Sequence, residues 1–480
     1  MPRTKTQKNP VKLVRSGLFH LKRKNWNKAH KKFEEALEDE DLQQNPGVWS
    51  NFGISLANLN RLSEAQEAFM RALTLDKKNP SIWIKKGLIE YQLERFKDAA
   101  VSFEKARNLD KKDFEIPIFL ARALYKQKAI KKSITTLERA MNRFPQSHKI
   151  RIELAKIYSQ EEEMKKAEEV LEAAIGSTPH PEPGLILGQH LLDQKDYNKA
   201  IKIYERVLSQ FPNSVHAQYG LGIAKHALGD WPSAISEYNK ARMMFRPNKP
   251  PQGFWINTAR VLKQLKRYNE SIDALYRAKK TGKPPLEVFI LLAELYLEKD
   301  MPEKAKEALE EASRVDKANP LIPYYMGLIE LRYGAVNPAK EHFKWSLELD
   351  TDFIDSKFQL AFLTSRENAR ESYILALEIL DQDSNYYPAR KLAARLAFGF
   401  KEYRKTIDLL ELAIVEDPPN RSDDIEILLR AWLENNESEK AITFFKHLFN
   451  KNQSIRDLLI TSPFVAQFLN ENGFQEENDL

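Results

Sequence analysis

Cysteine does not occur anywhere in the 480 residues. Its absence excludes disulfides, thiolate nucleophiles and cysteine-ligated zinc sites. Apolar runs of eighteen or more residues are also absent, so we expect no membrane-spanning helix. The first twenty residues hold no apolar stretch followed by a small-residue cleavage site, so we expect no signal peptide. Together these absences favour a cytoplasmic protein.

Recognisable catalytic motifs are missing as well. The sequence has no GxxxxGK[ST] or GxGxxG phosphate-binding loop, no HExxH and no GxSxG. His216 and His226 are ten residues apart in one expected helix, which is not the i,i+3 or i,i+4 spacing of metal ligands on a helix. We therefore predict that the protein is not an enzyme, and we predict no metal site, no cofactor and no small-molecule substrate.

Acidic residues are absent from the first 33 positions, which carry eleven lysines and arginines. The net charge of the whole chain is +7, and the remaining residues hold 64 basic and 68 acidic side chains. The chain is thus a nearly neutral body with a basic N-terminal region. This region could bind an acidic protein, RNA or an anionic membrane surface, or it could be a solubilising cap. The basic patch consists of Lys22, Arg23, Lys24, Lys28, Lys31 and Lys32.

An internal repeat organises the rest of the chain. The pattern W-x3-G-x11-A-x3-F-x2-A occurs at 49–72 and again at 83–106. Ala65, Phe69 and Ala72 lie at i, i+4 and i+7, which places them on one face of a helix. The glycine lets two helices approach closely, and the large residues fill the space between them. This pattern resembles the tetratricopeptide repeat, a helix–turn–helix unit of about 34 residues.

The small residue of the motif recurs along the chain at nearly equal steps. The resemblance implies an all-α fold, a right-handed α-solenoid of about 12–13 helix–turn–helix repeats. The pattern weakens at 362–386 and after Pro418. The small-residue positions are Gly17, Gly53, Gly87, Ala121, Ala155, Gly188, Gly222, Ala259, Ala293, Gly327, Ala361 and Ala394, with Leu429 as a degenerate thirteenth.

The repeat also divides the chain into segments. We expect a basic N-terminal arm at 1–9, repeats 1–7 at 10–246 and repeats 8–13 at 254–450. Between them, residues 247–253 form a proline-rich turn that adds three residues to the usual step. We expect a helix at 451–472 that caps the last repeat, followed by an acidic tail at 473–480.

The resemblance further implies that residues of each repeat's first helix line a concave groove. Their mixture of aromatic, amide and cationic side chains suits a protein partner, because tyrosine and arginine are enriched where proteins bind each other. Few carboxylates occur at these positions before Glu294, so we expect a partner segment with acidic and apolar side chains. The groove positions are Asn51, Lys85, Tyr91, Phe119, Arg122, Tyr125, Lys126, Lys156, Tyr219, Asn257, Arg260, Lys263, Tyr324 and Arg332.

Some members of this family hold the C-terminal carboxylate of chaperones in a clamp of lysine, asparagine and arginine. Here Asn51 and Lys85 match the clamp, but Val14 and Leu18 stand where it needs polar residues. We therefore do not predict chaperone-tail binding. The hypothesis is a non-enzymatic scaffold or adaptor that binds a protein or peptide in its groove and mediates complex assembly. In the alternative, the basic N-terminal region docks on RNA or an anionic membrane surface and the array recruits partners there.

Overall fold

The structure is a computed structural model that describes residues 9–245, 249–417, 422–451, 458–459 and 461–472. These residues form 28 helices and no strand, which confirms the predicted all-α fold. Parts of the expected segments lie outside the described residues: 1–8 of the basic arm, 247–248 of the proline-rich turn, 452–457 and 460 of the capping segment, and the whole acidic tail. Within the described part, no helix is both long enough and apolar enough to cross a bilayer.

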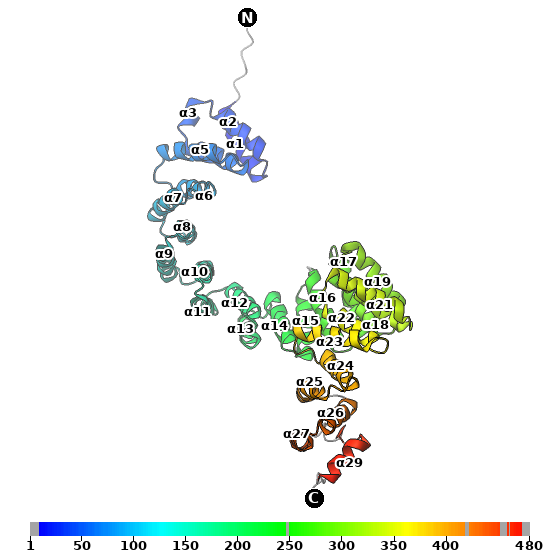
Figure 1. The fold of residues 1–480 in the computed structure, drawn as a ribbon. Coiled ribbons are helices and arrows are strands. Elements are labelled where there is room, and N and C mark those ends of the chain that lie inside the picture. Colours follow the sequence, from blue (N-terminus) through cyan, green and yellow to red (C-terminus); the bar gives the residue numbers. More distant parts are fainter. Residues whose placement is uncertain (1–8, 246–248, 418–421, 452–457, 460, 473–480) are drawn as a thin grey trace. The chain divides into compact units, whose positions relative to one another are not determined.

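The chain divides into two compact units, Met1–Lys249 and Pro250–Leu480. In the first unit, each second helix packs on its own first helix and, except for the last, on the first helix of the next pair (Figure 1). A short helix, α3 (Glu40–Gln43), follows the first pair. The pairs are α1 (Pro10–Lys22) with α2 (Trp26–Ala36), α4 (Pro46–Asn58) with α5 (Leu62–Leu75), α6 (Pro80–Gln92) with α7 (Phe96–Leu109), α8 (Glu115–Lys126) with α9 (Ile130–Arg143), α10 (His148–Gln160) with α11 (Met164–Ala174), α12 (Glu182–Asp193) with α13 (Tyr197–Gln210), and α14 (Val215–Ala227) with α15 (Trp231–Met244).

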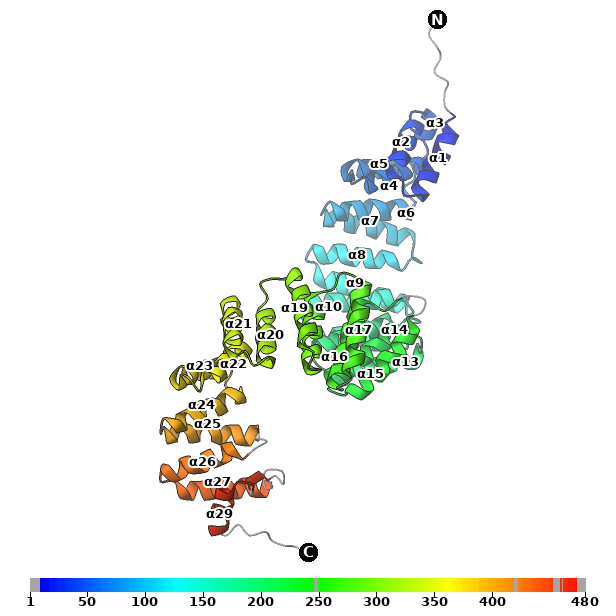
Figure 2. The ribbon, with the colours of Figure 1, turned by 90° about the vertical axis from the view of Figure 1, so that its right-hand side faces the viewer.

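The second unit is built from the same kind of helix pair (Figure 2). Its last described helix, α29 (Pro463–Glu471), contacts α26 and buries Val465 and Leu469 in a cluster with Trp432 and Phe445. The pairs are α16 (Gln252–Gln264) with α17 (Tyr268–Thr281), α18 (Leu286–Glu298) with α19 (Pro302–Val315), α20 (Leu321–Arg332) with α21 (Val336–Leu349), α22 (Ile354–Thr364) with α23 (Ala369–Gln382), α24 (Tyr387–Gly399) with α25 (Tyr403–Glu416), and α26 (Asp423–Glu434) with α27 (Ser438–Lys451).

The turn between the two helices of a pair has the same backbone conformation in almost every repeat. Its residue seven places after the small residue has a positive φ, as at Asn60 (62°) and Lys128 (61°). The N–H of the next residue then bonds the carbonyl five places back, as from Arg61 to Leu56 at 3.0 Å. This Schellman motif satisfies carbonyls at the end of the first helix and reverses the chain.

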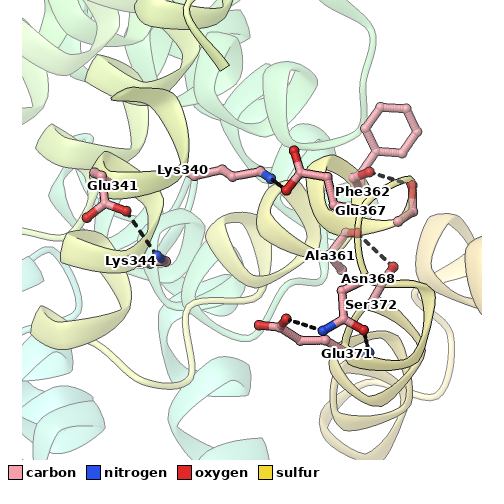
Figure 3. A network of polar contacts seen from close by, with 10 residues as sticks. Lys340, Glu341, Lys344, Ala361, Phe362, Glu367, Asn368, Glu371 and Ser372 are labelled. Carbon is pink, nitrogen blue, oxygen red and sulfur yellow. Dashed lines mark hydrogen bonds and ion pairs between the residues drawn. The ribbon is translucent and has the colours of Figure 1, made fainter. Parts of the chain in front are cut away.

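The pair α22/α23 departs from this turn. Asn368, at the equivalent position, has a φ of −139°, and the turn is one residue shorter. A buried hydrogen bond between the two helices is nevertheless kept. Ser372 Oγ donates to the carbonyl of Ala361 at 2.7 Å, and the two residues are eleven positions apart. In the α8/α9 pair, the equivalent bond joins Ser133 Oγ to the carbonyl of Ala121, which are twelve positions apart. Figure 3 shows this turn, in which Lys340 of α21 pairs with Glu367. The weak motif at 362–386 therefore folds as a variant of the same pair.

Candidate functional site

Two adjoining pockets lie on the surface that the first helices form in the first unit, which we call the first-helix face. One pocket, of about 340 Å³, lies between α6 and α8. The other, of about 330 Å³, lies between α8 and α10 and reaches Glu182 of α12. Both are lined by Phe119 and Arg122. The two pockets together therefore make one candidate site that spans four consecutive repeats.

Helical periodicity explains why the predicted residues meet here. Phe119 and Arg122 are three residues apart on α8, and Leu88 and Tyr91 are three apart on α6, so each couple shares a helix face. The pocket between α6 and α8 is lined largely by apolar side chains, with Phe103 of α7 at its base. Leu88 is 38% exposed there. This pocket can therefore accept an apolar side chain.

A bidentate ion pair separates the two pockets. Arg122 Nε lies 2.7 Å from Glu153 Oε1, and its Nη2 lies 2.6 Å from Oε2. The hydrogen bonds that Arg122 donates to this carboxylate raise the pKa of Arg122. The Arg122 side chain is 45% exposed, while that of Glu153 is only 11% exposed. Arg122 is therefore already paired, so it lines the two pockets as part of an ion pair and not as a free charge.

Lys156 is the cation that the pocket between α8 and α10 leaves available. It is exposed, lines the pocket and makes no ion pair within the described residues. Lys149, in the same pocket, pairs with Glu115 at 2.8 Å. Arg122, a predicted groove residue, is thus exposed but paired, whereas Lys156 is exposed without an ion pair among the described residues.

The neighbouring predicted residues on α8 differ in their surroundings. The Tyr125 hydroxyl donates to Glu161 Oε1 at 2.9 Å, and burial together with this bond raises the pKa of Tyr125. Lys126 is exposed and has no ion pair within the described part of the chain. Neither residue lines the two pockets. They border the site instead of forming it.

Three other predicted residues of the first unit lie away from these pockets. Lys85 donates to Ser50 Oγ at 3.2 Å, and burial lowers the pKa of this lysine. Asn51 is half-buried on α4. Tyr219 packs on Tyr238 with ring centroids 5.6 Å apart. These three residues therefore do not belong to the site that Phe119 lines.

In the second unit, the predicted cations mostly bind carboxylates of the next first helix. Arg260 pairs with Glu287, and Lys263 pairs with Glu294, each joining α16 to α18. Arg332 is exposed without an ion pair among the described residues. Asn257, next to these pairs on α16, is half-buried.

Tyr324 lies in an aromatic cluster between repeats. Its ring centroid is 5.4 Å from that of Phe353 and 6.0 Å from that of Phe343. Burial raises the pKa of Tyr324 to about 12. The residue was expected to be exposed in the groove, but most of its ring packs between α20, α21 and the segment before α22. These ring contacts explain the difference, because burying an aromatic ring against other rings is more favourable in free energy than leaving it in water.

The basic patch at the N-terminus is largely exposed in the described residues. Lys22, Arg23, Lys24, Lys28 and Lys31 are exposed at the end of α1 and on α2. Lys32 instead pairs with Glu35 at 3.0 Å, and the Arg23 guanidinium lies over the Phe19 ring at 4.3 Å. The patch thus keeps most of its charge available to a partner.

One cluster among the described residues brings together three side chains of the kinds that bind metals. His148 Nε2 and His180 Nδ1 lie 3.5 Å and 3.8 Å from Glu182 Oε2. However, the two imidazole rings are stacked, with centroids 4.2 Å apart and planes 9° apart, so one ion cannot lie in both ring planes. His180 Nδ1 also accepts the backbone N–H of Glu182 at 3.2 Å. This arrangement is a contact between repeats and not a formed coordination site.

The sequence interpretation missed this cluster and considered His216 and His226 instead. The carboxylate partners of Arg122 and His148 lie about one repeat further along the chain. A separation close to the repeat length places two residues on neighbouring first helices. A search for opposite charges at this separation would have found the Arg122–Glu153 and Lys263–Glu294 pairs.

Comparisons with known proteins agree with the helix pairs. Residues 4–184 match a family described as the cilia and flagella-associated protein 70 C-terminal domain, a tetratricopeptide repeat domain. Residues 191–250 and 286–319 match tetratricopeptide repeat families.

Two human proteins are similar to parts of the chain. Tetratricopeptide repeat protein 13 is 29% identical over 164 residues, which are 33% of this chain and 19% of that protein. Protein O-mannosyl-transferase TMTC3 is 25% identical over 199 residues, which are 39% of this chain and 21% of that protein. The chain therefore spans about a fifth of the length of these curated relatives.

Among solved structures, yeast Tom70 aligns with 97% of this chain and 100% of its own, at 17% identity and a TM-score of 0.41.

The family assignment rests on the repeat matches and on the geometry. The described residues contain thirteen helix pairs, most of which place a small residue of the first helix against a large residue of the second, and repeat families match in both units. The chain belongs to the tetratricopeptide repeat proteins.

Proposed function

We propose that the protein is a non-enzymatic scaffold that binds a protein or peptide partner on the first-helix face of its first unit and so mediates complex assembly. The observation that supports this proposal is the pair of adjoining pockets that share Phe119 and Arg122. Repeat arrays use the extended surface of their stacked helices to bind partners. Such a surface fits an extended segment better than a compact small molecule.

The partner segment should carry an apolar side chain followed by a carboxylate. The apolar side chain would enter the pocket of Leu88, Tyr91 and Phe119, where it loses contact with water. The carboxylate would pair with Lys156, the available cation of the second pocket. Arg122 stays bound to Glu153 and offers its remaining N–H groups at the boundary.

The other predicted groove residues remain part of the proposal as separate surfaces. In the first unit, Asn51, Lys85 and Tyr219 would extend contacts along the first-helix face. In the second unit, Arg332 is the exposed cation that a partner could use. The pairs of Arg260 and Lys263 make those two residues weaker candidates for direct contact.

Site-specific crosslinking tests the proposal. A photo-reactive amino acid replaces Leu88, at the exposed edge of the apolar pocket, and the crosslinked segment of the partner is identified and synthesised. That peptide should bind the native chain, and Phe119→Ala and Lys156→Glu should each weaken its binding about tenfold or more. Ile186→Ala provides a control at the equivalent position two repeats later, outside both pockets. Unchanged binding by both site variants would overturn the proposal.

The exposure of the basic patch favours a second candidate function. Five of its six cations are exposed, so the N-terminal region could dock on RNA or an anionic membrane surface while the array recruits partners. Such binding weakens steeply as salt rises, because phosphate contacts release counterions. Titration with single-stranded RNA and with phosphatidylserine vesicles at two salt concentrations tests it. No binding at low salt would remove both partners.

A further inference from the structure

A second groove lies on the other side of the first unit, between the second helices α7 and α9. Its volume is about 760 Å³, and Leu120 and Leu124 of α8 lie at its base. None of its lining residues belongs to the two pockets of the first-helix face. The groove is therefore a separate surface, and an inference about it does not depend on the proposed function.

The rim of this groove is strongly basic. It carries six cations and one carboxylate, Glu104, which is already paired with Arg107. Lys105 lies over the Trp83 ring at 4.4 Å, and the other four cations make no ion pair within the described residues. The six cations are Lys97, Lys105, Arg107, Lys131, Lys132 and Arg139.

The base of the groove is apolar, in contrast to its rim. Ala100 and Leu120 are almost fully buried beneath it, and Val101 is 55% exposed at its side. The hydroxyls of Thr135 and Thr136 each donate to a carbonyl of their own helix at 2.7 Å. These hydroxyls of α9 already have acceptors, and the apolar residues at the base of the groove favour contact with an apolar surface.

The excess of positive charge does not recur in the next second helix, α11. Lys165 and Lys166 of α11 occupy the positions that Lys131 and Lys132 hold in α9, one repeat earlier. Other positions of α11 are more acidic or less basic than those of α9: Ile134, Thr135 and Arg139 correspond to Glu168, Glu169 and Ala173. The basic groove is thus a local feature and not a property of every repeat.

We propose that this groove binds an acidic amphipathic helix of a partner protein. The apolar side of such a helix would lie on Val101, Leu120 and Leu124, and its carboxylates would meet the cations on both rims. A bilayer surface cannot reach the base of a cleft between two helices. Nucleic acid would leave the apolar base uncovered, and the lining has no aromatic ring on which bases could stack.

Selection from a displayed library of random 18-residue peptides tests this inference. The library is selected on the full chain and depleted on the variant Lys131→Glu/Lys132→Glu. The recovered peptides should be rich in glutamate and aspartate, with apolar residues at i, i+3, i+4 and i+7. Neutral or basic peptides, or no peptide that depends on the two lysines, would overturn the inference.

Fluorescence anisotropy of one recovered peptide then measures the contribution of the groove. Lys131→Glu/Lys132→Glu should weaken binding about 30-fold, and Lys165→Glu/Lys166→Glu, the matched control, should change it less than twofold. Circular dichroism shows whether both variants keep their helices, and Val101→Asp supplies a second variant at the base that should also weaken binding about tenfold. A single-stranded RNA or phosphatidylserine vesicles that bind as tightly as the peptide, with the same dependence on Lys131 and Lys132, would also overturn it.

Discussion

Phe103 packs against Gly87 so closely that a Cβ on this glycine would lie 2.7 Å from the edge of the ring. Phe103 is fully buried, so its ring cannot turn into solvent. The same separation of sixteen residues joins a glycine to an aromatic residue in six repeats, and it joins an alanine to a leucine in several others, such as Ala121 and Leu137. The size of the first residue is matched to the size of the second.

This match predicts the effect of adding one methyl group. Gly87→Ala should lower the free energy of unfolding of the α6/α7 pair by about 1–3 kcal/mol, because the buried ring has nowhere to move. Adding Phe103→Leu should recover part of the loss, since it recreates the alanine–leucine pair. Hydrogen exchange of the amides in α6 and α7 measures both effects within the array, which need not unfold in one step.

Gly253→Ala is the control for this prediction, because a Cβ on Gly253 would meet nothing within 4 Å. The Gly253→Ala variant should leave the protection of the amides against hydrogen exchange unchanged. The proposed match of sizes is wrong if Gly87→Ala behaves like Gly253→Ala. It is also wrong if Gly87→Ala combined with Phe103→Leu lowers the free energy of unfolding by as much as the two single substitutions added together.

The left-handed residue in the turn of each pair gives a second prediction. Lys128 has a φ of 61°, a conformation that costs a residue with a side chain about 1–2 kcal/mol. Lys128→Gly should therefore raise the free energy of unfolding of the α8/α9 pair by about 0.5–1 kcal/mol after the entropy of the glycine is counted. Chemical denaturation monitored by hydrogen exchange measures the change.

Asn368→Gly should have the opposite effect at the equivalent turn position. Asn368 has a negative φ, and its side chain accepts the backbone N–H of Glu371 at 3.2 Å as the N-cap of α23. Glycine would remove this bond and gain no conformational relief. Equal effects at the two positions would contradict this interpretation of the turn.

The ion pair between α8 and α10 predicts a cost for removing only one partner. Arg122→Ala should lower stability by about 1–3 kcal/mol, because it leaves the largely buried Glu153 carboxylate unpaired. Glu153→Gln, added to Arg122→Ala, should recover part of this loss. Lys149→Ala is the control, since Lys149 and Glu115 are both about half exposed, and its cost should stay below about 0.5 kcal/mol. Similar losses in the two single variants would count against a structural role for the Arg122 pair.

The stacked histidines predict that stability depends on pH. Burial, and then the neighbouring His180, lower the pKa of His148 from its ordinary value of 6.5, with Lys149 acting in the same direction and Glu182 against it. Below about pH 6.5 the unfolded chain therefore binds more protons at this position than the folded chain does, and folding loses stability. The melting temperature should be level above pH 7 and fall as the pH drops from 6.5 toward 5.5.

His148→Gln tests this assignment, because glutamine cannot take up the proton. The variant should show a smaller fall in melting temperature between pH 7.5 and pH 5.5 than the native chain, while His216→Gln, on α14, should show the same fall as the native chain. An unchanged slope in His148→Gln would assign the pH dependence to other groups.

The repeat period was enough to predict the helix pairs, because each pair needs one close approach, such as that of Gly87 to Phe103, at a fixed place. The pairing of Arg122 with Glu153 was not predicted. The motif compares positions within one repeat, whereas this pair joins two neighbouring first helices, so only a search for opposite charges about one repeat apart would have found it. The same reason applies to the basic groove, since its cations come from two different repeats.

The weak motif at 362–386 leads to the last prediction. In α23 the residue that packs against Ala361 is Ala376, where other pairs place leucine or an aromatic ring, and Ile374 on the same helix is 57% exposed. Less apolar surface is therefore buried between α22 and α23 than between α6 and α7. The amides of α22 and α23 should exchange with solvent faster than those of α6 and α7, because local opening there breaks fewer packing contacts. Equal protection of the two pairs in the native chain would show that the polar contacts around Lys340, Glu367 and Ser372 compensate for the smaller core.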